Sequence, residues 1–224
     1  MNLQEKMSLT RKIFEQALGL SPAGNIFAAW TGGKDSTVML HQWMHFLGEK
    51  APGVQVRALS LDTGYKFPQV LEFRDEIAWE WGVELRVAGP ESIDAQDLEE
   101  ASKVECCRML KVKPLQEAVK KHGVKVLLTG IRRDEHPSRE NTPDVQEKND
   151  PDYYQVNPIA HWTEMDIWSY IMLKGLPYCS LYDAGYRSLG CKPCTVKGTH
   201  MNERSGRDRE KEENLDMLRS MGYF

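Results

Sequence analysis

The chain has 224 residues, with 29 Lys and Arg against 33 Asp and Glu and a formal net charge of −4. Its 41% hydrophobic and 28% charged residues are typical of a globular protein and exclude a disordered or fibrous chain. No apolar run approaches the roughly 18 residues of a membrane helix, and the N-terminal residues are too charged for a signal peptide. We therefore expect a cytoplasmic protein that binds no membrane, and the acidic balance disfavours nucleic acid as a partner.

Helical periodicities and short apolar runs alternate along the chain. Helices are expected at 4–18, from residue 37 to about 45, at 68–81, at 107–122 with an interruption at Pro114, and at 163–173; strands are expected at 26–30, 54–61, 84–87 and 124–129. The polar stretch 132–153 contains three prolines and reads as a long surface loop. This alternation predicts an α/β fold with a parallel sheet covered by helices on both faces. Residues 1–195 would form this domain, and 196–224 a charged C-terminal arm with a short final helix.

A glycine-rich turn separates the first expected strand from the helix that follows it. It consists of Thr31, Gly32, Gly33, Lys34, Asp35 and Ser36. Glycines let the backbone approach an anion, a helix N-terminus offers unpaired N–H groups, and a lysine adds positive charge. The spacing is not that of a Walker A loop. The turn predicts a phosphate or sulfate site, although a tight strand-to-helix turn would use the same glycines.

The five cysteines are unevenly spaced. Cys106 and Cys107 are adjacent, Cys191 and Cys194 form a CxxC pair, and Cys179 stands alone. Adjacent cysteines rarely bond to each other, because the disulfide would strain the peptide. Two pairs of thiols favour a four-ligand metal or iron–sulfur site, with zinc as the simpler occupant. Cys179 is most simply a small buried apolar residue.

Several segments resemble a known family. Residues 30–41 (WTGGKDSTVMLH) resemble the PP-loop of the adenine-nucleotide α-hydrolase superfamily. Four further segments are similar to sulfonucleotide reductase motifs: 61–64 (LDTG), 106–115 (CCRMLKVKPL), 156–163 (VNPIAHWT) and 185–195 (GYRSLGCKPCT). Over residues 25–207 the chain is thus identified as a member of the phosphoadenosine/adenosine phosphosulfate (PAPS/APS) reductase family.

The resemblance implies a PP-loop fold and a set of functional residues. Cys106, Cys107, Cys191 and Cys194 would ligate a [4Fe–4S] cluster, and Lys111 would lie between cluster and substrate in a supporting catalytic role. The sulfonucleotide would be bound by Thr31, Gly32, Gly33, Lys34, Asp35, Ser36, Asp62, Lys111, Arg132, Arg133, Arg139, Arg204 and Arg207. Guanidinium groups suit the oxygens of a phosphosulfate. Beyond Arg207, the mixed charge of the arm predicts a solvated surface.

Two departures from the reductase pattern bear on function. The reductases use a cysteine near the C-terminus as nucleophile, whereas this chain has no cysteine after Cys194. The thiol that such a reaction needs would come from a partner or from Cys179, or the reaction is a different one. Residues 64–75 and 130–139 also look more like the small subunit of ATP sulfurylase, which lacks the cluster cysteines.

The hypothesis that we favour is that the protein is a [4Fe–4S] enzyme that reduces APS or PAPS to sulfite and an adenosine phosphate. Thioredoxin, glutathione or another thiol would be the donor, and we expect a homo-oligomer or a subunit of a complex. An ATP-cleaving nucleotidyl transferase is the main alternative, with Mg²⁺ on Asp35 and Asp62. A non-catalytic nucleotide-binding or redox-sensing subunit is the third.

Overall fold

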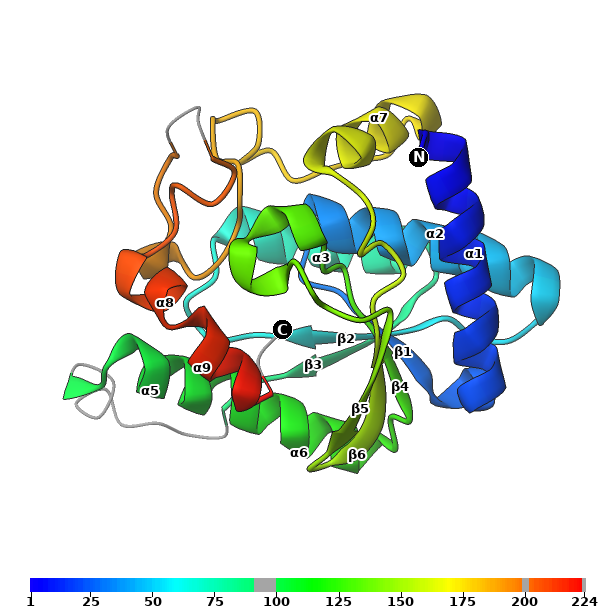
Figure 1. The fold of residues 1–224 in the computed structure, drawn as a ribbon, viewed down its shortest axis with the longest axis horizontal. Helices are drawn as coiled ribbons and strands as arrows, with labels where there is room; N and C mark the ends of the chain where they lie inside the picture. Colours follow the sequence, from blue (N-terminus) through cyan, green and yellow to red (C-terminus); the bar gives the residue numbers. More distant parts are fainter. Residues whose placement is uncertain (91–99, 199–201, 223–224) are drawn as a thin grey trace.

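A computed structural model describes residues 1–90, 100–198 and 202–222. One six-stranded sheet runs through the molecule in the order β3-β2-β1-β4-β6-β5 (Figure 1). The strands are β1 (Ile26–Ala29), β2 (Arg57–Leu61), β3 (Glu84–Ala88), β4 (Val126–Leu128), β5 (Val145–Asn149) and β6 (Asp152–Val156). All neighbours pair in parallel except β5, which is antiparallel to β6 at the edge. The chain reverses its direction of growth between β1 and β4, the place where open α/β sheets bind ligands.

Helices cover both faces of the sheet (Figure 1). One face carries α1 (Leu3–Leu20), α2 (Lys34–Lys50), α3 (Pro68–Glu80) and α7 (Glu164–Lys174). The other carries α6 (Lys113–His122), preceded by α5 (Lys103–Cys107) and the π-helical turn Arg108–Val112. The arm adds α8 (Arg209–Glu213) and α9 (Leu215–Ser220), which pack against α5. The expected α/β class, with helices on both faces, is confirmed.

The central strand β1 divides the core. Ile26, Ala28 and Trp30 belong to the cluster under α1, α2, α3 and α7, whereas Phe27 and Ala29 belong to the cluster under α6. This is the period-2 alternation of a strand buried on both faces. Because the whole strand is buried, the turn that follows it starts from a rigid support.

The expectation of a long loop at 132–153 is wrong. This segment contains two short 3₁₀ turns, strand β5, and the start of strand β6, which pair as a hairpin. Strand β5 (VQEKN) carries one apolar residue and is at most half-buried, which is how an edge strand avoids further pairing. Hydrophobic alternation is therefore too weak there to reveal it, and the sheet is mixed rather than wholly parallel.

Two further expectations need correction. Pro114 does not interrupt a helix: it lies in the first turn of α6, where a proline needs no N–H partner, and the irregularity is the π-helical turn before it. The arm beyond Arg207 is not wholly solvated either, because Lys211 is 1% exposed and Leu215 and Leu218 are buried. None of the helices described is long and apolar enough to cross a membrane.

The hydroxyl of Thr10 ties α1 to the segment that precedes α7. Thr10 Oγ1 donates to the carbonyl of Pro158 at 2.9 Å and accepts from the indole N–H of Trp162 at 3.0 Å, and Thr10 is fully buried. We predict that Thr10→Val lowers the free energy of unfolding by about 2 kcal/mol, because both partners stay buried without a hydrogen bond. Urea denaturation measures this. Ser8→Ala is the control, since Ser8 is exposed; equal stability of the two variants would contradict the assignment.

Candidate active site

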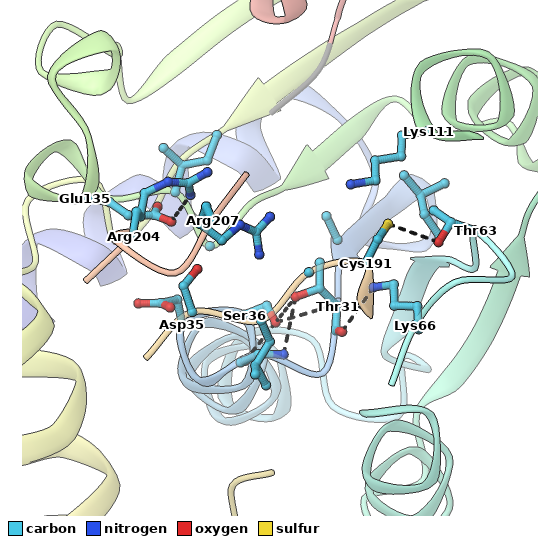
Figure 2. Close-up of a pocket in the computed structure, with 18 of the residues that line it drawn as sticks. Thr31, Asp35, Ser36, Thr63, Lys66, Lys111, Glu135, Cys191, Arg204 and Arg207 are labelled. Carbon is cyan, nitrogen blue, oxygen red and sulfur yellow. Dashed lines mark hydrogen bonds and ion pairs between the residues drawn. The ribbon is translucent and has the colours of Figure 1, made fainter. Parts of the chain in front are cut away.

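A cavity of about 160 Å³ lies at the carboxyl ends of β1, β2 and β4. Its wall contains residues of the glycine-rich turn, of the ends of β2 and β4 and the segments that follow them, of the π-helical turn, of the segment after α7 and of the arm. They are Thr31, Gly33, Asp35, Ser36, Leu61, Thr63, Lys66, Lys111, Gly130, Ile131, Glu135, Arg139, Tyr182, Cys191, Arg204 and Arg207. Figure 2 shows the turn on one side of this cavity, with Arg204 and Arg207 across from it. The arm therefore closes over the ligand-binding edge of the sheet.

The glycine-rich turn is held by its own hydroxyl groups. Ser36 Oγ accepts from the Thr31 N–H at 3.2 Å and donates to the Gly33 carbonyl at 2.9 Å. Gly32 has a φ of +78°, which favours glycine. A Cβ on Gly130 would lie 2.8 Å from the Ser36 nitrogen, so the chain after β4 packs directly on the start of α2. The turn thus directs the N-terminus of α2, a helix of 17 residues, toward the cavity. Helix N-termini are suited to binding anions.

Three arginines line the opposite wall. Glu135 lies between Arg139 and Arg204, with 2.5 Å from its Oε1 to Arg204 Nη1. A second carboxylate, Glu212, holds Arg204 through both oxygens at 2.6 and 2.8 Å. Arg207 differs: its Nε and Nη1 are buried and have no hydrogen-bond partner among the described residues. Buried donors are normally satisfied, so Arg207 is the cation in this wall best placed to bind an added anion.

Lys34 and Arg132 do not line the cavity. Both are buried, with side chains 1% and 0% exposed, and both pair with the carboxylate of Glu203 in the arm. Asp35 bridges them from the other side, at 3.1 Å from Lys34 Nζ and 2.6 Å from Arg132 Nε. Burial raises the pKa of Asp35, but the two cations outweigh burial and the net pKa is lowered. These two predicted substrate-binding cations are therefore already neutralised by the protein.

The remaining predicted residues lie outside the cavity wall. Asp62 accepts the Gly64 N–H at 2.9 Å, and Arg133 is engaged by Asp144 at 2.9 Å. Of the two suggested Mg²⁺ ligands, Asp35 lines the cavity and Asp62 does not. Cys179 is 1% exposed in the main core, where burial raises the pKa of its thiol, and it lines neither this cavity nor the one below. The functional roles of Asp62, Arg133 and Cys179 stay predictions.

All four paired cysteines line a second cavity of about 290 Å³. Cys106 and Cys107 come from α5, and Cys191 and Cys194 from the turn at the start of the arm. The backbone of Lys66 bridges to Cys191, which ties this turn to the end of β2. Lysines 103, 111 and 211 complete the wall. Within the described ranges, no group of three His, Cys, Asp or Glu side chains is close enough to hold a single metal ion.

The four thiols do not share one environment. Burial raises the pKa of Cys106 and of Cys194, and neighbouring thiols add to the effect. Burial also opposes ionisation of Cys191, but Lys111 and the hydroxyl of Thr63, 3.3 Å from its sulfur, lower the net pKa of that thiol. Of these three thiols, Cys191 is the one whose surroundings favour the thiolate.

Lys111 and Cys191 line both cavities. Figure 2 shows Lys111, Cys191 and Thr63 together on one side of the first cavity, away from Arg204 and Glu135. Lys111 and Cys191 would therefore contact both a ligand in the first cavity and a group held by the four thiols in the second.

Sequence reasoning missed Thr63, Lys66, Glu135 and Tyr182 as cavity residues. Thr63 and Lys66 directly follow β2, and the end of a parallel strand is a signal that could have found them. Tyr182 carries no such signal, because it lies in the irregular segment after α7 and reaches the cavity only through the tertiary fold.

The mixed sheet, with a glycine-rich turn between β1 and α2, defines an α/β protein of the PP-loop class. Comparisons narrow the class: the phosphoadenosine phosphosulfate reductase domain matches residues 25–197. The chain belongs to the PAPS/APS reductase family of the PP-loop superfamily.

Named relatives agree with this assignment. The chain is 34% identical over 201 residues to adenosine 5′-phosphosulfate reductase of Salinibacter ruber, covering 85% of this chain and 77% of that protein. It is 37% identical over 172 residues to the Rhodococcus opacus enzyme of the same name, covering 73% and 68%.

Two solved structures share the fold at low identity. PAPS reductase from Candida auris has a TM-score of 0.67 at 22% identity, covering 84% of this chain and 90% of that one. Candida glabrata FMN adenylyltransferase has a TM-score of 0.74 at 23% identity, covering 88% and 66%. These similarities establish the fold alone.

We predict that Glu203→Gln lowers the free energy of unfolding by about 3 kcal/mol, because two buried cations lose their shared carboxylate. Denaturant titration tests this. Glu213→Gln is the matched control, since Glu213 pairs with exposed Arg209 at the surface and its loss should leave stability unchanged. Equal midpoints for the wild type and Glu203→Gln would show that the arm is not anchored through this carboxylate.

The ion pairs of Glu135 should make the stability of the protein depend on pH in the acid range. Burial raises the pKa of Glu135, but Arg139 and Arg204 hold it well below its ordinary value of 4.5. A carboxyl with a lowered folded pKa stabilises the fold above the unfolded pKa and loses that contribution as the pH falls. The stability difference between wild type and Glu135→Gln should therefore narrow below pH 4.5. Unfolding curves across this range measure it, and a constant difference would contradict the ion-paired state.

Proposed function

We propose that the chain is a sulfonucleotide reductase that binds APS or PAPS in the anion cavity and releases sulfite and an adenosine phosphate. The observation that carries this proposal is the shared wall, where Lys111 and Cys191 face both the anion cavity and the four-thiol cavity. Membership of the PAPS/APS reductase family and the reductase names of the relatives support the substrate class.

The charge of the anion cavity suits a phosphosulfate. The glycine-rich turn offers a helix N-terminus, and Arg207 offers unpartnered buried donors. Glu135, Glu203 and Glu212 pair with Arg139, Arg204, Lys34 and Arg132. Lys66 and Lys111 add further positive charge to the cavity wall, which supports an anionic ligand.

The residues of the second cavity fit a [4Fe–4S] cluster. Four thiols are the ligand set of such a cluster, and all four line this one cavity. A cluster held by Cys106, Cys107, Cys191 and Cys194 would supply a compact charged centre beside the reacting group. Lys111 would then bind the sulfonate on one side and balance the thiolates on the other.

The reaction also needs a thiol nucleophile. A thiolate would attack the sulfate sulfur, forming an S-sulfonate and releasing AMP or its 3′-phosphorylated form; a second thiol would displace sulfite and leave a disulfide. The sulfur is reduced and the two thiols are oxidised, so one dithiol balances the step. Buried Cys179 lies away from the cavity, and we propose thioredoxin, glutathione or another thiol donor for this role.

Anaerobic purification followed by iron, sulfide and sulfite analysis tests the proposal. We expect about four iron atoms per chain and sulfite release from APS that depends on an added dithiol. The Cys191→Ser variant should lose iron. The Cys179→Ser variant, which changes a thiol of the core, should keep both iron and activity.

Three results would overturn parts of this account. Zinc in the purified protein in place of iron would contradict the assignment of a [4Fe–4S] cluster. Loss of sulfite release in iron-loaded Cys179→Ser would show that Cys179 is the nucleophile. Pyrophosphate release from ATP and Mg²⁺, with no sulfite from APS or PAPS, would replace the reductase by a nucleotidyl transferase.

A further inference from the structure

Tyr182 joins the glycine-rich turn to the wall of the anion cavity. It lies after α7, and its side chain lines the cavity together with Thr31, Gly33 and Asp35. Its hydroxyl oxygen accepts the backbone N–H of Lys34, the first residue of α2, at 2.9 Å. The Lys34 amide at the N-terminus of α2 is thus already hydrogen-bonded. The Tyr182 hydroxyl, rather than this amide, faces the cavity.

The geometry leaves the hydroxyl proton of Tyr182 for another acceptor. A phenol has one proton to donate, and the proton of the 2.9 Å contact comes from the Lys34 amide. No described residue forms a hydrogen bond that uses the Tyr182 proton. Burial raises the pKa of Tyr182, so the phenol stays protonated and keeps its capacity to donate.

Aromatic neighbours fix the direction of this donor. The ring of Trp168 packs edge-on against Tyr182 at 5.4 Å between centroids, and the ring of Tyr178 lies at 6.4 Å. The Lys34 ammonium lies 5.6 Å from the centre of the Tyr182 ring. A phenol held on these sides cannot swing away from the turn without breaking several contacts, so its donor is preorganised.

We propose that Tyr182 is a substrate-binding residue whose hydroxyl donates to an anionic oxygen of the nucleotide 5′-phosphate at the glycine-rich turn. The proposal rests on the proposed function only in taking this cavity as the site of the nucleotide's anionic end. Tyr182 contributes a neutral donor at the turn, and Arg207 contributes a charged donor from the arm across the cavity.

Calorimetric titration with AMP tests the proposal without requiring turnover. Tyr182→Phe should bind AMP about tenfold more weakly, because a buried hydrogen bond to a charged oxygen is lost. Tyr178→Phe is the matched control: its hydroxyl bonds Asp183 at 3.1 Å, it belongs to the same aromatic cluster, and it does not line the cavity. We expect its AMP affinity to equal that of the wild type.

A second substitution separates donation to the ligand from support of the turn. Replacing Tyr182 with 3-fluorotyrosine makes the phenol a stronger donor and a weaker acceptor, so AMP should bind more tightly if the hydroxyl contacts the ligand. Weaker binding would reduce Tyr182 to a residue that only holds the Lys34 amide.

The outcomes distinguish this proposal from the proposed function. Wild-type affinity in Tyr182→Phe would overturn the role of Tyr182 while leaving the reductase intact. AMP binding weakened as expected, with no sulfite from APS or PAPS, would leave Tyr182 in place and reject the reductase. No binding of AMP, APS or PAPS to the wild type would overturn both.

Discussion

The buried carboxylate of Glu203 is the contact on which the candidate site depends. It pairs with Lys34 at the start of α2 and with Arg132 after β4, and the three side chains are almost completely buried. Isolated charges at that depth would cost several kcal/mol each, so the three groups have to be assembled together. Their assembly fixes the arm over the sheet edge and sets Arg204 and Arg207, the neighbours of Glu203 in sequence, in the cavity wall.

This ion-pair cluster changes the role that we assign to the buried cations near the glycine-rich turn. A lysine in a glycine-rich turn suggests direct anion binding, yet Lys34 serves the protein's own carboxylates. Other donors line the cavity, among them Lys111 and Arg207, and we propose that the Tyr182 hydroxyl joins them. Lys111 and Cys191 line both this cavity and the four-thiol cavity, which supports our proposal that the two act as one site.

The sequence predicted the parts that depend on local pattern. The order of β1, the glycine-rich turn and α2 follows from an apolar run, two glycines and a helical periodicity, and the helix expected at 163–173 is α7. It could not predict β5, whose polar edge lacks alternation, nor the partner of Lys34, because Glu203 lies 169 residues away. The two pairs of thiols predicted that the four cysteines lie together, and they do line one cavity; the resemblance added the prediction that they ligate a cluster.

The central claim is that the anion cavity and the four-thiol cavity form one functional unit. Its most direct test is the visible absorption spectrum of anaerobically purified, iron-loaded protein during titration with AMP. The account predicts a spectral change that saturates with AMP binding in the wild type and is lost in Lys111→Ala at full iron content, because Lys111 faces both cavities. AMP that binds without changing the wild-type spectrum would contradict the claim.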